Sequence, residues 1–186
     1  MNPLILFLER SPTPVGQMLI MTDAEDRLRV VDWEDYEPRM LQLLGQHYGK
    51  QNYALRERSG PPSQARRRLD AYMAGDLAAI DDLEVATAGT PFQRDVWAEL
   101  RRIPLGRTIS YSELAQRIGR PKAVRAVGLA NGANPISIVI PCHRVIGANA
   151  SLTGYGGGLH RKVWLLEHEG VRLASREARQ RQPALF

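Results

Sequence analysis

The only cysteine of the 186-residue chain lies in the segment Ile140-Pro141-Cys142-His143-Arg144. An apolar run leads into it, and proline, which has no backbone N–H, is expected to end that run and turn the thiol into a cleft. A thiol beside a base or a cation loses its proton more easily than free cysteine, whose pKa is about 8.5, and only the thiolate is a strong nucleophile. The segment therefore predicts a reactive cysteine. The alternative is that Cys142 is a small buried hydrophobic residue.

Three short helices are expected ahead of the cysteine. Thr90-Pro91-Phe92-Gln93 combines a capping residue, a proline suited to the first helical position and a side chain that can reach back to the cap, so a helix is predicted from there to Ile103. A second cap at Ser110 opens a short helix, and a third helix is predicted from Lys122 to Asn131. Three short helices with tight turns are typical of a helix-turn-helix module that binds nucleic acid.

The third of these helices is rich in small residues. Ala123, Ala126, Gly128 and Ala130 lie along it, and Arg125 projects from among them. Small side chains let a helix backbone approach another surface closely. That surface can be a groove of nucleic acid or a neighbouring helix, and the composition alone leaves both open.

The N-terminal half is predicted to be a sheet with flanking helices. The expected elements are strands over residues 3–9, 16–22 and 28–33, and helices over residues 37–48 and 64–74. Residues 49–62 are polar and end in Gly60-Pro61-Pro62, so a loop is predicted there. No residue pattern in this half indicates chemistry, and a scaffold role is expected.

The charge is divided unevenly along the chain. Residues 1–89 have a net charge of −4, residues 90–175 a net charge of +7, and residues 176–186 a net charge of +2. A basic half beside an acidic half indicates a polyanionic partner such as nucleic acid. A basic surface can also simply be solvated, and charge alone does not decide between the two.

The location of the protein is predicted from its cysteine usage and its apolar runs. A single cysteine excludes an internal disulfide and a cysteine-cluster zinc site, and it favours a reducing compartment. The apolar N-terminal run is too short for a signal peptide, and no stretch approaches the ~18 apolar residues of a membrane helix. We therefore expect a cytoplasmic protein without a membrane partner.

Two features follow the cysteine. Residues 147–158 are rich in Gly, Asn, Ser and Thr, which predicts a loop that forms either one wall of a pocket or an ordinary surface connection. A final helix is predicted over residues 159–168, with Leu159, Val163 and Leu166 on one face. Glu169, at the end of this helix, is a candidate to orient His143 as an acid orients a catalytic base, although glutamates in such positions are usually solvated.

Taken together, these motifs resemble those of the O6-alkylguanine-DNA alkyltransferases, also called methylated-DNA–protein-cysteine methyltransferases. The resemblance covers residues 90–173, and the N-terminal half resembles the bacterial constitutive form more loosely. The matching residues are 125–128, 134–135, 140–145, 155–158, 164–166 and 168–170.

The resemblance implies an α+β fold with two domains. A ribonuclease-H-like β-sheet domain with helices is expected over residues 1–86, and a winged helix-turn-helix domain that binds DNA and carries the active site over residues 87–175. Residues 176–186 are expected to form a basic tail that is disordered. The implied partner is double-stranded DNA that carries an alkylated guanine. A monomer is expected, and cooperative assembly along DNA stays open.

The resemblance also implies the reaction. The alkyl group on O6 of guanine, and less readily that on O4 of thymine, is transferred to Cys142 after the base has been flipped out of the duplex. The enzyme would be a methylated-DNA–[protein]-cysteine S-methyltransferase that acts once and is consumed, without a metal or cofactor. The implied catalytic residues are Cys142, His143, Glu169, Tyr111 and Asn134.

Further site residues follow from the same resemblance. Arg125 is expected to fill the gap that the flipped base leaves in the stack, while the third helix lies in the minor groove. The expected DNA-binding residues are Arg125, Ala123, Ala126, Gly128, Ala130, Arg120, Arg94 and Ser112. The expected pocket residues are Val145, Tyr155, Gly156 and Gly157.

Two other classes of protein compete with this interpretation. A non-catalytic sensor of alkylated DNA would lack the cysteine, so Cys142 argues against that class. A cysteine hydrolase would not need the basic half or the small-residue helix, and it would turn over many times.

Overall fold

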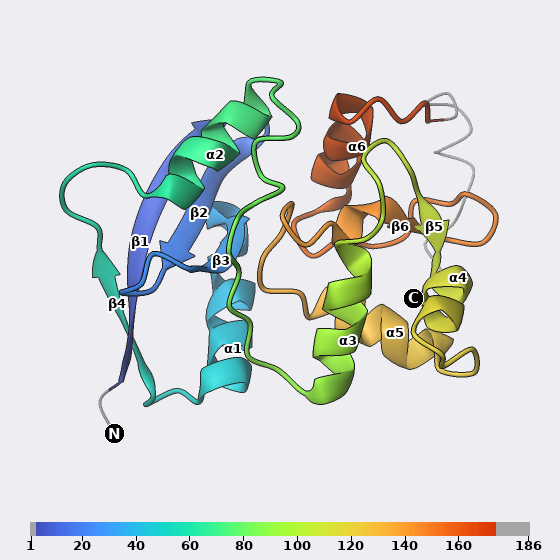
Figure 1. The fold of residues 1–186 in the computed structure, drawn as a ribbon, viewed down its shortest axis with the longest axis horizontal. Coiled ribbons are helices and arrows are strands. Elements are labelled where there is room, and N and C mark those ends of the chain that lie inside the picture. The colour runs from blue at the N-terminus through green and yellow to red at the C-terminus, as the bar shows by residue number, and fades with distance from the viewer. Residues whose placement is uncertain (1–2, 174–186) are drawn as a thin grey trace. The chain divides into compact units, whose positions relative to one another are not determined.

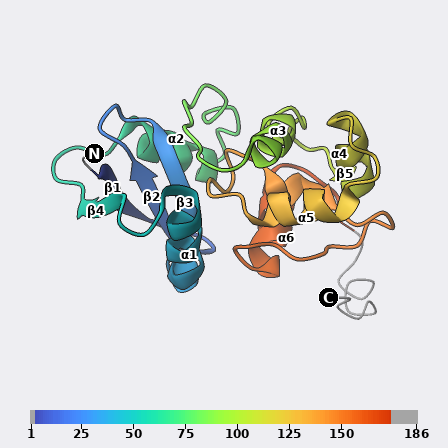
Figure 2. The ribbon, with the colours of Figure 1, turned by 90° about the horizontal axis from the view of Figure 1, so that it is seen from below.

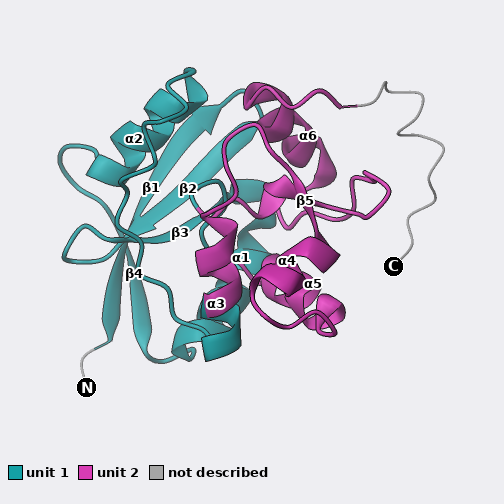
Figure 3. Cartoon of the chain, turned by 45° about the vertical axis from the view of Figure 1, so that its right-hand side comes forward, with its two compact units in different colours: residues 1–94, 135–139 teal, residues 95–134, 140–186 magenta. Residues whose placement is uncertain are grey.

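The computed structural model describes residues 3–173, and the chain divides into two compact units, which Figure 3 shows in different colours. Unit 1 comprises Met1–Arg94 and Pro135–Val139, and unit 2 comprises Asp95–Asn134 and Ile140–Phe186. A short segment just ahead of the cysteine is therefore part of the N-terminal unit. The expected tail over residues 176–186 lies outside the described residues. Within the described part, no helix is long and apolar enough to cross a membrane.

Unit 1 is built on a four-stranded sheet in the order β3-β2-β1-β4 (Figure 1). Its elements are β1 (Leu4–Thr13), β2 (Gly16–Thr22), β3 (Leu28–Trp33), η1 (Glu34–Tyr36), α1 (Glu37–Tyr48), β4 (Tyr53–Glu57) and α2 (Gln64–Met73). The first three strands are antiparallel neighbours and lie where the sequence predicts them. Strand β1 runs further than expected and includes Pro12. The proline is tolerated because β4 pairs with β1 only as far as Leu8, so that edge of β1 is open beyond it.

The predicted loop over residues 49–62 is wrong where β4 forms. Strand β4 pairs in parallel with β1, with Tyr53 opposite Leu4 and Glu57 opposite Leu8. It is a short strand at the sheet edge and its last residues are exposed, so its sequence carries no alternation of apolar and polar residues. Pairing with an existing strand, rather than local pattern, decides its conformation.

The two helices of unit 1 cover opposite faces of the sheet, as Figure 2 shows. Leu8 packs in one core with Met40 of α1. The next residue, Glu9, points to the other face and accepts a hydrogen bond of 3.0 Å from the amide of Ser63, the N-cap residue of α2. Successive strand residues point to opposite faces, so the alternation in β1 determines which helix covers which side.

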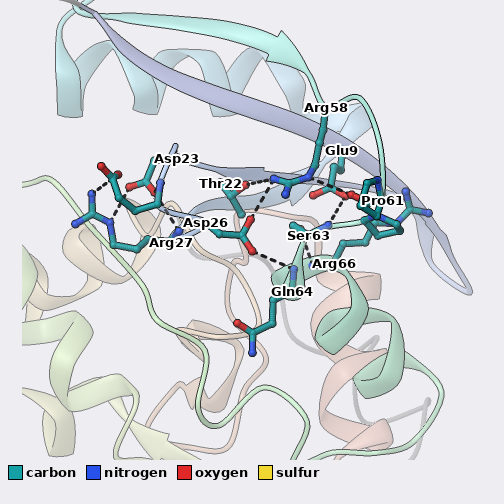
Figure 4. Close-up of polar contacts among 12 residues, drawn as sticks. Glu9, Thr22, Asp23, Asp26, Arg27, Arg58, Pro61, Ser63, Gln64 and Arg66 are labelled. Atoms are coloured by element: carbon teal, nitrogen blue, oxygen red, sulfur yellow. Dashed lines mark hydrogen bonds and ion pairs between the residues drawn. The ribbon is translucent and has the colours of Figure 1, made fainter.

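Oxygen acceptors satisfy the first amides of α2. The Ser63 hydroxyl accepts from the amide of Arg66 at 3.0 Å, and the Asp26 carboxylate accepts from the amide of Gln64 at 3.2 Å (Figure 4). The first amides of a helix have no partner within the helix, so such acceptors fix where it begins.

The segment Pro135–Val139 extends the sheet of unit 1 beside β3. The amide of Val31 donates to the carbonyl of Pro135, and the amide of Ser137 donates to the carbonyl of Val31, each at 3.0 Å. Val31 and Ile136 form a parallel bridge. Two backbone hydrogen bonds therefore fix the chain shortly before it reaches Cys142.

Unit 2 consists of short helices and a small parallel pair of strands. Its elements are α3 (Pro91–Leu100, whose first residues belong to unit 1), β5 (Ile109–Ser110), α4 (Tyr111–Arg117), α5 (Val124–Gly132), η2 (Cys142–Arg144), β6 (Val145–Ile146) and α6 (Leu159–His168). Strand β5 pairs with β6, and α4 packs against α5 (Figure 1).

The predicted caps of α3 and α4 are confirmed. Thr90 and Gln93 exchange two hydrogen bonds, of 2.9 and 3.2 Å, and the hydroxyl of Ser110 accepts from the amide of Glu113 at 3.1 Å. These bonds connect residues three apart in sequence, which is why the sequence shows them.

Candidate active site

Two tight turns bring the chain to Cys142. The first is centred on Ile138, whose φ is 73°, and the amide of Val139 donates to the carbonyl of Ser137 at 2.9 Å. The second is centred on Pro141, whose φ of −80° and ψ of 64° fit an inverse γ-turn, and the amide of Cys142 donates to the carbonyl of Ile140 at 2.8 Å. A β-branched residue at positive φ is strained, so neighbouring contacts must hold it. Pairing of the preceding residues with β3 provides such contacts.

Asn134 holds the thiol directly. Its amide nitrogen Nδ2 lies 3.1 Å from Sγ of Cys142 and 2.8 Å from the carbonyl oxygen of Ile140. Both Asn134 and Cys142 are buried, and Cys142 keeps a 5% exposed fraction. A hydrogen bond donated to sulfur favours the charged thiolate over the neutral thiol. Asn134 therefore positions Cys142 and supports its anionic form.

The side chain of Glu169 joins the two residues that follow the cysteine. Its Oε1 lies 2.9 Å from Nε2 of His143. It also forms a bidentate ion pair with Arg144, in which Nε donates to Oε2 at 2.8 Å and Nη2 donates to Oε1 at 2.9 Å. All three side chains are buried. Burial alone would raise the pKa of Glu169, but the hydrogen bonds from His143 and Arg144 lower it well below its usual range. The carboxylate is therefore ionised and returns to the core.

His143 is a neutral base in this setting. Burial lowers its pKa, and this effect exceeds the opposing influence of Glu169. Because Nε2 faces a carboxylate, the proton of the neutral ring belongs on Nε2, where it is donated to Glu169. The other nitrogen, Nδ1, is buried and has no hydrogen-bond partner among the described residues. A lone pair at Nδ1 is thus available to accept a proton.

Tyr111 supplies a hydroxyl at the start of α4. Burial raises the pKa of Tyr111, although a hydrogen bond with Thr153 acts in the opposite direction, and a negative charge on Cys142 raises it further. Its hydroxyl lies 3.5 Å from Oγ1 of Thr153. The phenol therefore stays protonated at neutral pH and can donate its proton.

Buried cations of α6 hold the loop over residues 147–158, the glycine-rich loop. Nζ of Lys162 donates to the carbonyls of Val145 at 2.6 Å and Thr153 at 3.0 Å, and Nη1 of Arg161 donates to the carbonyl of Gly157 at 2.9 Å. On the same helix Leu165 and Leu166 are fully buried, whereas Leu159 is 45% exposed. The buried face of α6 can include these two cations because carbonyl oxygens in the interior provide their partners.

The predicted pocket residues are only partly accessible. The side chain of Val145 is fully buried and Gly157 is also buried, whereas Tyr155 and Gly156 are half-buried. A carbonyl oxygen has two lone pairs, so the carbonyl of Val145 can accept one further hydrogen bond beside that from Lys162. Of the four predicted pocket residues, only Tyr155 and Gly156 therefore have partly exposed surface.

Helix α5 exposes one face. Arg125 and Ala126 are exposed and Ala123 is half-buried. Ala130 is buried and its carbonyl accepts a hydrogen bond of 2.9 Å from Nε1 of Trp97, so its expected contact with DNA is wrong. Gly128 is half-buried, and a Cβ there would lie 3.9 Å from the ring of Tyr111.

The remaining expected DNA-binding residues are on the surface. Arg120 and Ser112 are exposed in unit 2. Arg94 is exposed but belongs to unit 1, where it donates to the carbonyl of Gly89 at 2.6 Å. Between Glu113 and Glu167 the sequence contains seven Lys or Arg and no acidic residue, which makes this stretch strongly basic.

Two residues of the site have roles that the sequence does not predict. Arg144 holds Glu169 and also donates to the carbonyl of Ile103 at 2.6 Å. Lys162 was not singled out at all. A lysine three residues before Leu165 and four before Leu166, both fully buried, was the available signal. Among the described residues, no group of three or more His, Cys, Asp or Glu side chains could hold a metal ion.

A family model and several relatives match this chain. Residues 91–171 match the DNA-binding domain of 6-O-methylguanine DNA methyltransferase. A protein of Salmonella typhimurium named methylated-DNA–protein-cysteine methyltransferase is 54% identical over 168 residues, which cover 90% of this chain and 98% of the relative. A protein of Mycobacterium leprae with the same name is 50% identical over 129 residues, which cover 69% of this chain and 78% of the relative.

Solved structures of similar proteins share the mixed α+β fold. The crystal structure of Mycobacterium tuberculosis O6-methylguanine methyltransferase has a TM-score of 0.70 and 39% identity, with 96% of each chain covered. The crystal structure of Mycobacterium tuberculosis OGT in complex with DNA has a TM-score of 0.69 and 40% identity, with 89% of this chain and 92% of that chain covered.

Proposed function

Because the chain belongs to the family of methylated-DNA–protein-cysteine methyltransferases, we propose that it repairs O6-alkylguanine in DNA by transferring the alkyl group to Cys142. O4-alkylthymine is a weaker substrate of the same reaction. The observation that carries the proposal is the contact of Sγ of Cys142 with Asn134, in a site that also holds a neutral, carboxylate-bound His143. The site thus has a nucleophile, a support for its anion and a base.

The transfer is a displacement at the alkyl carbon. The thiolate of Cys142 forms a carbon–sulfur bond while the carbon–oxygen bond to guanine breaks and its electron pair stays with the base. A proton delivered to a ring nitrogen lets guanine leave as a neutral molecule. Tyr111 is the donor, since its raised pKa keeps the phenol protonated until the base becomes negative.

His143 generates the thiolate. The proton of the Cys142 thiol passes to Nδ1 of His143 through a water molecule, and the ionised Glu169 stabilises the imidazolium that results. Arg144 keeps Glu169 ionised and in place. The burial that lowers the pKa of His143 keeps it neutral beforehand, so it is ready to accept the proton.

Helices α4 and α5 form the helix-turn-helix of a winged domain, and α5 enters the minor groove of double-stranded DNA. Its exposed Arg125 fills the space of the target base, which flips out of the stack to reach Cys142. Unit 1 serves as a ribonuclease-H-like scaffold. The protein acts in the cytoplasm as a monomer.

The reaction consumes the protein. A thioether is a poor leaving group, and the sequence contains no second cysteine that could take over the alkyl group. Each molecule therefore repairs one base. Repeated turnover would be expected only of a hydrolase, which releases its product and keeps its thiol.

Intact-mass measurement after mixing with a duplex oligonucleotide that contains O6-methylguanine tests the proposal. We expect one added methyl group per protein, located on Cys142 by peptide mapping, and an equal amount of restored guanine. The control variant Cys142→Ser should gain no mass. Restored guanine in excess of protein, with the protein mass unchanged, would contradict stoichiometric transfer and favour a hydrolase.

A further inference from the structure

Lys162 is a buried cation that the proposed mechanism does not use. Its side chain on α6 has no exposed surface, and both of its described hydrogen bonds go to backbone carbonyls. Burying an ammonium group is costly unless polar partners compensate for the lost water. A leucine at this position would avoid that cost. The presence of a lysine therefore makes Lys162 a candidate for a role in the site.

The two carbonyls belong to segments on either side of the catalytic residues. Val145 follows directly after η2, which contains Cys142 and His143, while Thr153 lies in the glycine-rich loop. The hydroxyl of Thr153 also reaches that of Tyr111. Lys162 thus ties the strand after the nucleophile to the loop beside the proton donor.

The charge of Lys162 acts on Cys142 and His143. Burial lowers the pKa of Lys162 to about 8, while a negative charge on Cys142 acts to raise it, so the amine is protonated at neutral pH. The ammonium and Arg144 disfavour a charged His143, whereas Glu169 favours it, so Lys162 helps to keep His143 neutral before the reaction. A negative charge on Cys142 and the positive charge of Lys162 stabilise each other, so the ammonium favours the thiolate of Cys142.

We propose that Lys162 is a positioning residue for alkyl transfer, which fastens the glycine-rich loop over the site and favours the thiolate of Cys142 through its charge. This inference rests on the proposed function, but the electrostatic part concerns the thiol alone. It can therefore be measured without DNA, with iodoacetamide as a small alkylating probe.

Three variants separate the effect of the charge of Lys162 from the effect of its two hydrogen bonds, which act as a tether between Val145 and Thr153. Lys162→Met removes both, Lys162→Gln keeps a hydrogen-bond donor without charge, and Lys162→Arg keeps the charge. The matched control Arg161→Met removes the neighbouring buried cation, which ties the same loop at Gly157. For each, the rate of Cys142 alkylation by iodoacetamide is measured from pH 5 to 10, and the rate of methyl transfer from the oligonucleotide at pH 7.

We expect the midpoint of the pH–rate profile to move upward by roughly one pH unit in Lys162→Met and Lys162→Gln. Lys162→Arg and Arg161→Met should keep the wild-type midpoint, because neither loses the charge at position 162. Methyl transfer at pH 7 should fall about tenfold in Lys162→Gln and further in Lys162→Met, which also loses the tether.

A wild-type midpoint in both uncharged variants, with the fold confirmed by near-ultraviolet circular dichroism, would overturn the inference. Should Lys162→Met not fold, Lys162→Gln and Lys162→Arg decide by the same criterion. A shifted midpoint in a protein whose wild type accepts no methyl group from DNA would instead refute the proposed function and leave the role of Lys162 intact.

A different observation concerns the surface of α5. Leu129 is 75% exposed, whereas the other exposed large apolar residues of the described chain are between 37% and 45% exposed. It lies four residues after Arg125, on the same side of the helix. Its exposed neighbours on this face are small or basic. The whole helix lies between Glu113 and Glu167, where the sequence has no acidic residue.

A basic face with one prominent apolar side chain suits the minor groove of DNA. Apolar side chains inserted there unstack neighbouring bases and bend the duplex. We infer that Leu129 is a second wedge, one helical turn from Arg125, which lowers the cost of flipping the target base. This inference also rests on the proposed function, and its test compares two DNA substrates.

Methyl transfer is measured on the same oligonucleotide as a duplex and as a single strand. Leu129→Ala should react about tenfold more slowly with the duplex and unchanged with the single strand, because only the duplex needs deformation. Leu129→Met should stay near wild type, and so should the control Leu105→Ala, which truncates another exposed leucine outside α5. Equal loss on both substrates, or no loss on the duplex, would overturn the wedge. Absence of transfer by the wild type on either substrate would instead refute the proposed function.

Discussion

Unit 1 and unit 2 each bury a carboxylate that arginines neutralise, but only in unit 2 is such a carboxylate connected to a base beside a nucleophile. In unit 1, Asp23 accepts from Nε of Arg27 at 2.9 Å and from Nε of Arg29 at 2.7 Å; Figure 4 shows the pair with Arg27. In unit 2, Glu169 accepts from Arg144 in a similar way, yet its other partner is the imidazole of His143. Both carboxylates pair with an arginine, but Asp23 contacts a second arginine where Glu169 contacts a histidine.

The pKa values follow the same logic in both places. Burial alone would raise the pKa of Asp23, and the hydrogen bonds from Arg29 and Arg27 lower it, as His143 and Arg144 do for Glu169. A lowered carboxylate pKa therefore does not by itself mark an active site. The distinguishing features are a buried histidine that stays neutral and a cysteine next to it in sequence.

Glu169→Gln should have the largest effect, because it removes the charge that both His143 and Arg144 face. We expect methyl transfer to slow by roughly 10²-fold, in line with the loss of acid–base assistance. The free energy of unfolding should fall by about 3–5 kcal/mol, since Arg144 would be left buried without an ionised partner. Single-turnover kinetics and urea denaturation measure the two effects. A fully active variant would show that the carboxylate is as purely structural as Asp23.

Arg125→Ala should slow methyl transfer from duplex DNA by roughly tenfold, since the finger that fills the stack is lost. Reaction of Cys142 with iodoacetamide should not change. Arg56→Ala, which removes an exposed arginine of unit 1, is the matched control and should repair duplex DNA normally. Wild-type repair by Arg125→Ala would show that the finger assignment is wrong.

Asp23→Asn should affect stability alone. Loss of the charge weakens the hydrogen bonds of Arg27 and Arg29, and we expect a decrease of about 1–3 kcal/mol in the free energy of unfolding. Methyl transfer by the folded variant should equal that of the wild type. Slower transfer by the fully folded variant would show that Asp23, like Glu169, contributes to the reaction.

Acid should destabilise the protein slightly through His143. Its folded pKa is lowered from 6.5, so the unfolded chain binds the proton first, and stability falls as the pH drops below about 6.5. We expect this group to contribute a loss of about 1 kcal/mol between pH 7 and pH 5. Urea midpoints of the wild type and of His143→Gln measure it, and the variant should have the flatter pH dependence. Identical slopes would indicate that His143 is already protonated in the folded protein.

The sequence determined the features that depend on neighbouring residues. The caps at Thr90 and Ser110 set the starts of α3 and α4 as predicted, and the final helix lies over the predicted residues. The single cysteine within Pro-Cys-His-Arg was also visible as the candidate nucleophile. Such features need only residues a few positions apart, so their spacing carries the information.

The tertiary structure decided which distant groups meet. Arg144 reaches Glu169 across 25 residues, and Lys162 reaches the carbonyl of Val145 across 17. Strand β4 exists because β1 offers it an edge, and Ala130 is buried because α3 packs against α5 through Trp97. A buried charge is stable only where the fold provides its partner, and spacing along the chain does not show which partner that will be.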